Sequence, residues 1–158
     1  MGSREVSLRY ENDGLIVSEQ VRPEPMSQEN VAIVRTLYEV WNGQNGRDGA
    51  LAFLADDFEF VNPHYAVESG TRHGHAGWSQ AMDSLDAAFH RHKHEVHETR
   101  DLGDRVLCFT TFVAKTSPDS PAWRQHEPHL WSLRDGKVIR LQWFHDRAEA
   151  LEAAGLSE

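Results

Sequence analysis

The stretch HLWSLRDGKVIRLQWFHDRAEALEAAGL, residues 129–156, decides the fold class of this chain. It contains two strand-like runs, 130–133 and 138–144, on either side of Asp135-Gly136, a dipeptide typical of a tight hairpin turn. A short closing helix follows the second run. The period-two alternation of a strand predicts one face made of Ile139, Leu141, Trp143 and His145. Such a face is suited to the wall of a pocket, and it is also the ordinary pattern of a sheet core with a histidine at its rim.

The segments before the hairpin alternate between helical and strand-like patterns. Apolar residues at three- and four-residue steps predict a helix that Ser27 caps and that ends at Asn42-Gly43. We then expect a short helix over 48–54, a strand over 58–62, a polar loop over 64–77, a helix over 78–89, strands over 92–100 and 105–115, and a loop over 117–121. Residues 1–25 lack a sustained apolar period, so we expect a poorly structured or surface-packed extension before a folded domain at 26–158.

This order of elements has a consequence for the architecture. Helices that precede a meandering antiparallel sheet pack on one of its faces, and the sheet curls around them. We therefore predict an α+β fold, in which a curved, mostly antiparallel sheet wraps around three helices from the N-terminal half as a cone-shaped barrel. The mouth of such a cone is a concave, mainly apolar cavity, which is a common site for small ligands.

Composition narrows the possible partners. A chain of 158 residues with 39% hydrophobic content fits one domain. The formal charge of −9, without a basic cluster, argues against nucleic-acid binding and makes a neutral or cationic small ligand easier to accommodate. No apolar run approaches the ~18 residues that span a bilayer, so we expect no membrane partner. The single cysteine, Cys108, allows no intrachain disulfide, and a cytoplasmic location is the default expectation.

Six short segments, taken in chain order, carry a family resemblance. They are Met26-Ser-Gln-Glu-Asn-Val-Ala-Ile-Val-Arg, Ala55-Asp-Asp-Phe-Glu-Phe, Arg72-His-Gly-His-Ala-Gly, Asp101-Leu-Gly-Asp-Arg-Val-Leu, Trp131-Ser-Leu-Arg-Asp-Gly-Lys-Val and Asp146-Arg-Ala-Glu-Ala-Leu-Glu-Ala-Ala-Gly-Leu. Together they resemble the SnoaL-like family of the nuclear transport factor 2-like, or ketosteroid isomerase-like, superfamily over residues 26–156. The resemblance implies the cone fold, a homodimer and a cavity for a hydrophobic small molecule. It does not imply one activity, because the scaffold hosts ketosteroid isomerases, polyketide cyclases, scytalone dehydratase, limonene epoxide hydrolase and proteins without a catalytic role.

The catalytic positions of these relatives are occupied by other residue types here. The general-base aspartate of the ketosteroid isomerases is matched by Asn62, which cannot take a proton. Their protonated aspartate, a carboxylic acid kept neutral by an apolar site, is matched by His129, which can donate a hydrogen bond to an oxyanion. The acid of the SnoaL-type cyclases is matched by Trp143.

Two functional hypotheses follow. The first is an isomerase, cyclase or dehydratase that uses no cofactor and acts on a hydrophobic carbonyl compound. One of His129 and His145 removes a proton next to the carbonyl, and the other histidine, or Asn62, stabilises the enolate. The second is a binding or dimeric assembly domain that does not transform its ligand. For either, the residues expected to contact the ligand are Tyr38, Trp41, Phe60, His64, Tyr65, Trp78, Met82, Trp131 and Trp143.

The run His90-Arg-His-Lys-His-Glu-Val-His is the remaining conspicuous feature. A His-x-His spacing on a strand can bind metal, but Arg91 and Lys93 are interleaved and would repel a cation. We therefore expect a solvated strand end and no metal site.

Overall fold

The computed structural model describes residues 23–157, and the predicted extension over 1–25 lies almost entirely outside them. Most helices lie in the first half of the described chain, and five strands follow in succession before the last helix. In chain order they are α1 (Pro23–Trp41), α2 (Gly46–Gly49), the 3₁₀ helix η1 (Ala50–Phe53), β1 (Leu54–Asn62), β2 (Gly70–His73), α3 (Gly74–Ala88), β3 (Arg91–Asp101), β4 (Arg105–Lys115), β5 (Trp123–His126), β6 (His129–Arg134), β7 (Lys137–Trp143) and α4 (Arg147–Ala153).

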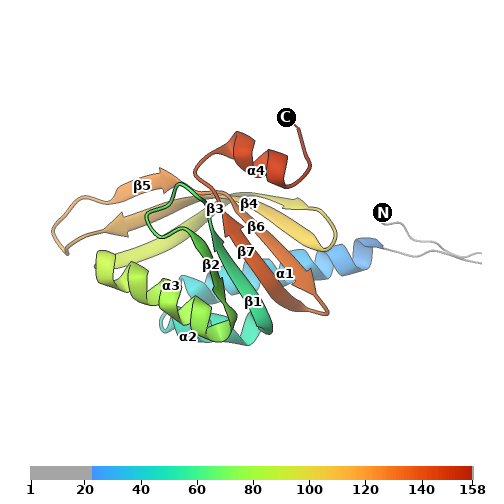
Figure 1. Cartoon of the computed structure of the whole chain (residues 1–158), viewed down its shortest axis with the longest axis horizontal. Coiled ribbons are helices and arrows are strands. Elements are labelled where there is room, and N and C mark those ends of the chain that lie inside the picture. Colours follow the sequence, from blue (N-terminus) through green and yellow to red (C-terminus); the bar gives the residue numbers. More distant parts are fainter. Residues whose placement is uncertain (1–22, 158) are drawn as a thin grey trace, which may run out of the picture.

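The strands form one curved sheet that does not close on itself (Figure 1). Its order is β2-β1-β7-β6-β4-β3, and β5 pairs with the outer part of β4. All pairings are antiparallel except that of β1 with β7, which is parallel, so the sheet is mixed. Helices α1, α2 and α3 lie on one side of the sheet and α4 on the other (Figure 1). The predicted α+β cone is confirmed.

Period-two alternation along β4 separates two apolar clusters. Val106 and Cys108 belong to the main core between the sheet and the helices, whereas Leu107 and Phe109 belong to a smaller cluster with α4. In α1 the buried side chains recur at three- and four-residue steps, as predicted. The main core includes Val34, Leu37, Tyr38, Trp41, Phe58, Trp78 and Trp131.

The hairpin has the predicted turn but a different inward face. Asp135 and Gly136 have φ values of 52° and 80°, the left-handed pair that a tight hairpin turn requires. The pairing shifts after Ser132, so that Leu133 pairs with Val138 while Ser132 pairs with Arg140. This bulge leaves Ile139 unpaired and half-buried, and Val138 takes its place in the core. The uninterrupted alternation predicted from Ile139 onward is therefore wrong at its first position.

Several predicted boundaries are also wrong. Helix α1 begins at Pro23, so Ser27 lies within it and is not its N-cap. Residues 48–54 are the end of α2, then η1 and the first residue of β1. The predicted loop over 64–77 contains β2 and the first turn of α3, and β5 was not predicted. Both β2 and β5 have four residues and no alternating apolar pattern, so they are strands because of their partner strands and not because of periodicity.

Within residues 23–157, no helix is long and apolar enough to cross a membrane.

Candidate functional site

A cavity of about 520 Å³ lies between the concave side of the sheet, α1, α3 and the loop before β2. Much of its wall is aromatic, with Trp41, Phe60, Phe112 and Trp143 among the lining residues. The buried part of the wall carries His94, Glu127 and His129, which we call the inner end. The exposed part carries Tyr65, Val67, Trp123 and His145, which we call the mouth.

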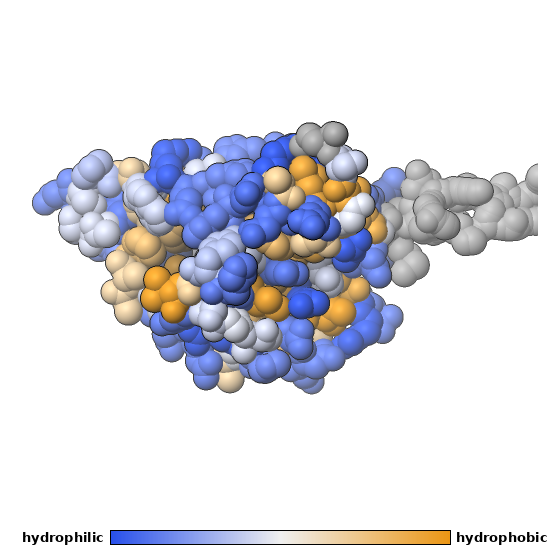
Figure 2. Space-filling model, turned by 45° about the horizontal axis from the view of Figure 1, so that its top comes forward, coloured by the Kyte–Doolittle hydropathy of each residue, from blue (hydrophilic) through white to orange (hydrophobic). Residues whose placement is uncertain are grey.

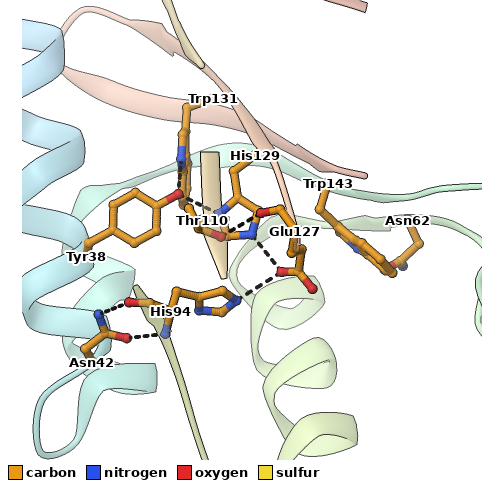
Figure 3. A network of polar contacts seen from close by, with 9 residues as sticks. All are labelled: Tyr38, Asn42, Asn62, His94, Thr110, Glu127, His129, Trp131 and Trp143. Atoms are coloured by element: carbon orange, nitrogen blue, oxygen red, sulfur yellow. Dashed lines mark hydrogen bonds and ion pairs between the residues drawn. The ribbon is translucent and has the colours of Figure 1, made fainter. Parts of the chain in front are cut away.

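The inner end is organised around one carboxylate oxygen (Figure 3). His129 Nε2 lies 2.7 Å from Glu127 Oε2, and His94 Nε2 lies 3.0 Å from the same atom. Both imidazoles are at most 3% exposed, whereas the Glu127 side chain is 16% exposed. Two buried rings therefore hold a carboxylate that still reaches the cavity.

A chain of hydrogen bonds fixes the orientation of His129. Trp131 Nε1 donates to the Tyr38 hydroxyl at 2.9 Å, and this hydroxyl lies 2.5 Å from His129 Nδ1. Because a phenol has one hydrogen to donate, we assign it to Nδ1, which leaves Nε2–H to donate to Glu127. Tyr38 and Trp131 therefore support the site from within the core and do not line the cavity.

The backbone around this centre is clamped on both sides. Thr110 Oγ1 donates to the Glu127 carbonyl at 2.6 Å, and the Glu127 amide donates to the Thr110 carbonyl at 2.8 Å. Pro128 restricts the residue before it to extended conformations, which suits the short link between β5 and β6. His94 is held by Asn42, which bonds to both its carbonyl and its amide at 2.7 and 2.9 Å.

Electrostatics define the charge states at the inner end. Burial disfavours an ionised Glu127, but hydrogen bonds from His129 and His94 outweigh burial and lower the pKa of the carboxyl to about 2. Burial also lowers the pKa of His94, against the pull of Glu127, so this ring is neutral near pH 7. Burial raises the pKa of Tyr38 well above its usual value, and its hydroxyl keeps its proton. The result is an ionised carboxylate held between His129 and a neutral His94.

The mouth is both aromatic and exposed. Among the described residues, the exposed large hydrophobic side chains are Tyr65, Val67, Val96 and Trp123, and all but Val96 line the cavity. On the face drawn in Figure 2, hydrophilic residues predominate and hydrophobic residues form separate patches. The His145 ring packs against Tyr65 and Trp143, with centroids 5.2 Å from each.

The structure brings some predicted site residues together and separates others. His129, His145 and Asn62 all line the cavity, as do Trp41, Phe60, Tyr65 and Trp143. Trp143 Nε1 donates to Asn62 Oδ1 at 2.7 Å, and Asn62 Nδ2 donates to the Gly70 carbonyl. Trp78, Met82, Tyr38 and Trp131 are core residues behind the wall. His64 lines a separate pocket of about 330 Å³ beside α4.

Two residues of the inner end were missed. Glu127 was not considered, although an acid two residues before a strand histidine was a visible signal. His94 was expected on a solvated strand end and is in fact buried, because it pairs with Phe112 and faces the aromatic wall. Within the described chain, His94, Glu127 and His129 are also the group that could hold a metal ion, with ligand atoms within 4.8 Å of one another.

Fold and site together define a cavity protein of the nuclear transport factor 2-like class. The model of the SnoaL-like domain family matches residues 34–141, more than two thirds of the chain, and the chain belongs to this family. TerC, co-crystallised with polyporic acid, is 25% identical at a TM-score of 0.66, with 80% of this chain and 98% of that chain covered. An NTF2-like protein from Burkholderia xenovorans LB400 is also 25% identical, at a TM-score of 0.58 with 80% and 95% covered.

A protein described as a SnoaL-like polyketide cyclase, from Jannaschia sp. CCS1, shares the fold at 21% identity and a TM-score of 0.65, with 89% and 100% covered. Among curated proteins, none matches the chain significantly. These likenesses show the fold that the chain shares with these proteins.

Proposed function

We propose that this protein is an acid–base enzyme that moves a proton on a hydrophobic carbonyl compound, as an isomerase, cyclase or dehydratase does. One observation carries the proposal: Glu127 presents a carboxylate to an aromatic cavity, with one oxygen held by two imidazoles and the other, Oε1, bound by no described residue. A carboxylate in this position can take a proton next to a carbonyl group and return it.

This proposal gives the base role to Glu127, whereas the sequence suggested one of the two histidines, His129 or His145. Both ring nitrogens of His129 already have protein partners, so His129 acts through Glu127 as a positioning residue. A pKa of about 2 makes Glu127 a weak base in the empty site. A ligand that covers its exposed oxygen removes water from the carboxylate and raises this pKa toward a useful range.

His145 has a different role at the mouth. No described residue hydrogen-bonds to its ring nitrogens, and the ring lines the cavity beside Trp143. A carbonyl oxygen directed toward the mouth can accept a hydrogen bond from His145, which stabilises the enolate that forms when Glu127 removes the proton. Asn62 supports this wall by holding Trp143.

The test is proton exchange in D₂O with 2-tetralone, a hydrophobic ketone with acidic α-hydrogens. We expect the native protein to accelerate deuterium incorporation and Glu127→Gln to lower the rate by ~10²-fold or more. Glu39→Gln, on the exposed face of α1, is the matched control and keeps the native rate. Exchange that is equally fast in Glu127→Gln would rule out the proposed base.

Non-catalytic binding is the second candidate, and the low pKa of Glu127 is the observation that favours it. A carboxylate that stays ionised can hold a ligand without taking its proton. Under this alternative 2-tetralone binds but its α-hydrogens exchange at the rate in buffer alone.

We further propose that the protein is a homodimer, as the family resemblance implies, and that it is cytoplasmic, because its single cysteine gives no sign of an oxidising compartment. Val96 on β3 is exposed and lies outside the cavity mouth, so it is a candidate for a contact between two copies. Sedimentation velocity at micromolar concentration measures the mass of the species, and a monomer at all concentrations contradicts this proposal.

A further inference from the structure

The hydrogen-bond donors at the inner end are already in use. His94 Nε2 and His129 Nε2 are directed at Glu127, and Tyr38 is directed at His129. Beside them, Trp131 Nε1 donates to Tyr38 and Trp143 Nε1 donates to Asn62. A ligand that reaches this end therefore meets side chains whose hydrogens are committed to other protein atoms.

The atoms that remain unbound there are acceptors. Glu127 Oε1 receives no hydrogen bond from any residue between 23 and 157. Nδ1 of His94 is buried without a partner, and in the neutral ring whose Nε2–H faces Glu127 this nitrogen carries a lone pair. An oxygen lone pair or an anion placed against these atoms would lose its hydration and gain no donor, which is unfavourable.

The mouth has the opposite character. The ring of His145 and the side-chain amide of Gln125 both line the cavity, and neither has a hydrogen-bond partner among the described residues. Both can donate to an oxygen. Arg72, which also lines the cavity, is already bound to Glu68 and close to Ser84.

From this inventory we infer that the substrates are ring ketones with a hydroxyl or ammonium group on the carbon beside the carbonyl. The donor hydrogen points to Glu127 and the carbonyl oxygen points to the mouth. The inference rests on the proposed function, because it uses the same carboxylate to recognise the substrate class. The aromatic wall fits the ring, and it also favours the ammonium form over an anion.

This substrate class satisfies the chemistry of the proposed step. In an α-hydroxy or α-amino ketone, one carbon carries both the donor group and the acidic hydrogen, so both face Glu127. When the C–H bond breaks, an O–H bond forms on Glu127 and the electron pair moves through the new C=C bond onto the carbonyl oxygen. This oxygen then accepts hydrogen bonds from the mouth, away from the buried carboxylate.

Isothermal titration of four related probes tests the inference without requiring turnover. The probes are 2-hydroxy-1-tetralone, 2-amino-1-tetralone as its ammonium ion, 2-methoxy-1-tetralone and tetralin-2-carboxylate. We expect the hydroxy and ammonium compounds to bind about tenfold or more tightly than the methoxy compound, which has no donor, and the carboxylate to bind most weakly. The first two probes show which donor, hydroxyl or ammonium, is preferred.

Glu127→Gln removes the charge and replaces one acceptor oxygen with a donor. In this variant we expect the hydroxy and methoxy compounds to bind within about twofold of each other, whereas Glu39→Gln keeps the native ranking. Equal binding of the hydroxy and methoxy compounds to the native protein, or preferred binding of the carboxylate, would overturn the inference. Should Glu127→Gln fail to fold, the ranking on the native protein decides alone.

The same measurements distinguish a failure of the proposed function from a failure of the inferred substrate class. A native protein that ranks the probes as expected but does not exchange the α-hydrogens of 2-tetralone has the inferred recognition without the proposed catalysis. A native protein whose exchange of these hydrogens depends on Glu127, but which does not prefer the probes that carry a donor, has the proposed catalysis without the inferred substrate class.

Discussion

The inner end and the mouth of the cavity are built from similar residue types but differ in how these residues are held. At the inner end, Tyr38 and His129 are buried and joined to each other and to Glu127 by hydrogen bonds. At the mouth, Tyr65 and His145 are exposed, and the Tyr65 hydroxyl binds Glu149 at the surface. Burial turns the first set into a rigid unit with a fixed charge pattern, while the second set is hydrated and free to adapt to a ligand.

This difference suits the inner end to holding the proton-transfer group and the mouth to accommodating the rest of the ligand. A proton-transfer group needs a defined position and few competing water molecules, and Glu127 has both. A mouth of exposed aromatic rings can accept ligands of different size, because its side chains are not tied into the core. Variants at the inner end should therefore change stability, rate and the preference for a donor group, whereas variants at the mouth should mainly change affinity.

The largest expected effect is that of Glu127→Ala on stability. This change leaves the buried Nε2–H groups of His94 and His129 without their acceptor, and we expect a loss of about 3–5 kcal/mol in the free energy of unfolding. Glu39→Ala, at an exposed position on α1, changes it by about 0.5 kcal/mol or less. Urea denaturation measures both, and a loss below about 1 kcal/mol for Glu127→Ala would mean that the two ends are equally loosely held.

The second effect is an acid dependence that originates at the inner end. The pKa of Glu127 is lowered in the folded chain, to about 2 from 4.5, so its contribution is complete above pH ~5 and is lost as the pH falls toward 2. The pKa of His94 is also lowered, so below pH ~6.5 the unfolded chain takes up a proton that the folded chain resists. Both effects have the same sign, and stability falls on acidification.

We expect Glu127 to account for about 2 kcal/mol of the stability that is lost between pH 7 and pH 3. Chemical denaturation at a series of pH values between 7 and 3 measures it. In Glu127→Gln the free energy of unfolding should fall less steeply with pH below pH ~5 than in the native protein. In Glu39→Gln it should fall as steeply as in the native protein. An unchanged slope in Glu127→Gln would show that other carboxylates dominate.

The parts of the fold that the sequence predicts correctly are those set by residues close together in the chain. The helical spacing of Val34, Leu37 and Tyr38 and the turn at Asp135-Gly136 are local signals, and both are confirmed. The edge strands β2 and β5 have no such signal, because four residues without an alternating apolar pattern become a strand only through their partners. The bulge at Ile139 depends on the register between two strands and is likewise invisible to periodicity.

For the site, sequence patterns found the mouth more completely than the inner end. His145 and Tyr65 were expected at the cavity, and both line it. Glu127 and His94 are separated by 33 residues, and their contact depends on the pairing of β3 with β4 and of β4 with β6. A single sequence contains the residue types but not the register that brings the two side chains together.

The third effect compares the two tyrosines directly. Tyr38→Phe removes the hydroxyl that accepts from Trp131 and bonds to His129, and we expect a loss of about 2 kcal/mol because buried groups stay unpaired. Tyr65→Phe removes bonds to Glu149 and to the His145 amide at the surface, where water replaces them, and we expect less than about 1 kcal/mol. Thermal and urea denaturation of the two variants side by side test this order. Equal losses would contradict the distinction between a rigid inner end and a hydrated mouth.

The smallest effect on stability is expected at Trp123, the half-exposed aromatic residue of β5. Its ring packs against Phe89 and Phe112 at centroid distances of 6.0 and 6.1 Å, so Trp123→Ala removes part of the mouth but little of the core. We expect a stability loss of about 1 kcal/mol or less, together with an affinity for 2-hydroxy-1-tetralone that is about fivefold lower. Val96→Ala, at an exposed position outside the cavity, is the control and keeps the native affinity. If Trp123→Ala binds the probe as tightly as the native protein, the mouth does not contribute to recognition, and the aromatic wall deeper in the cavity must hold the ring alone.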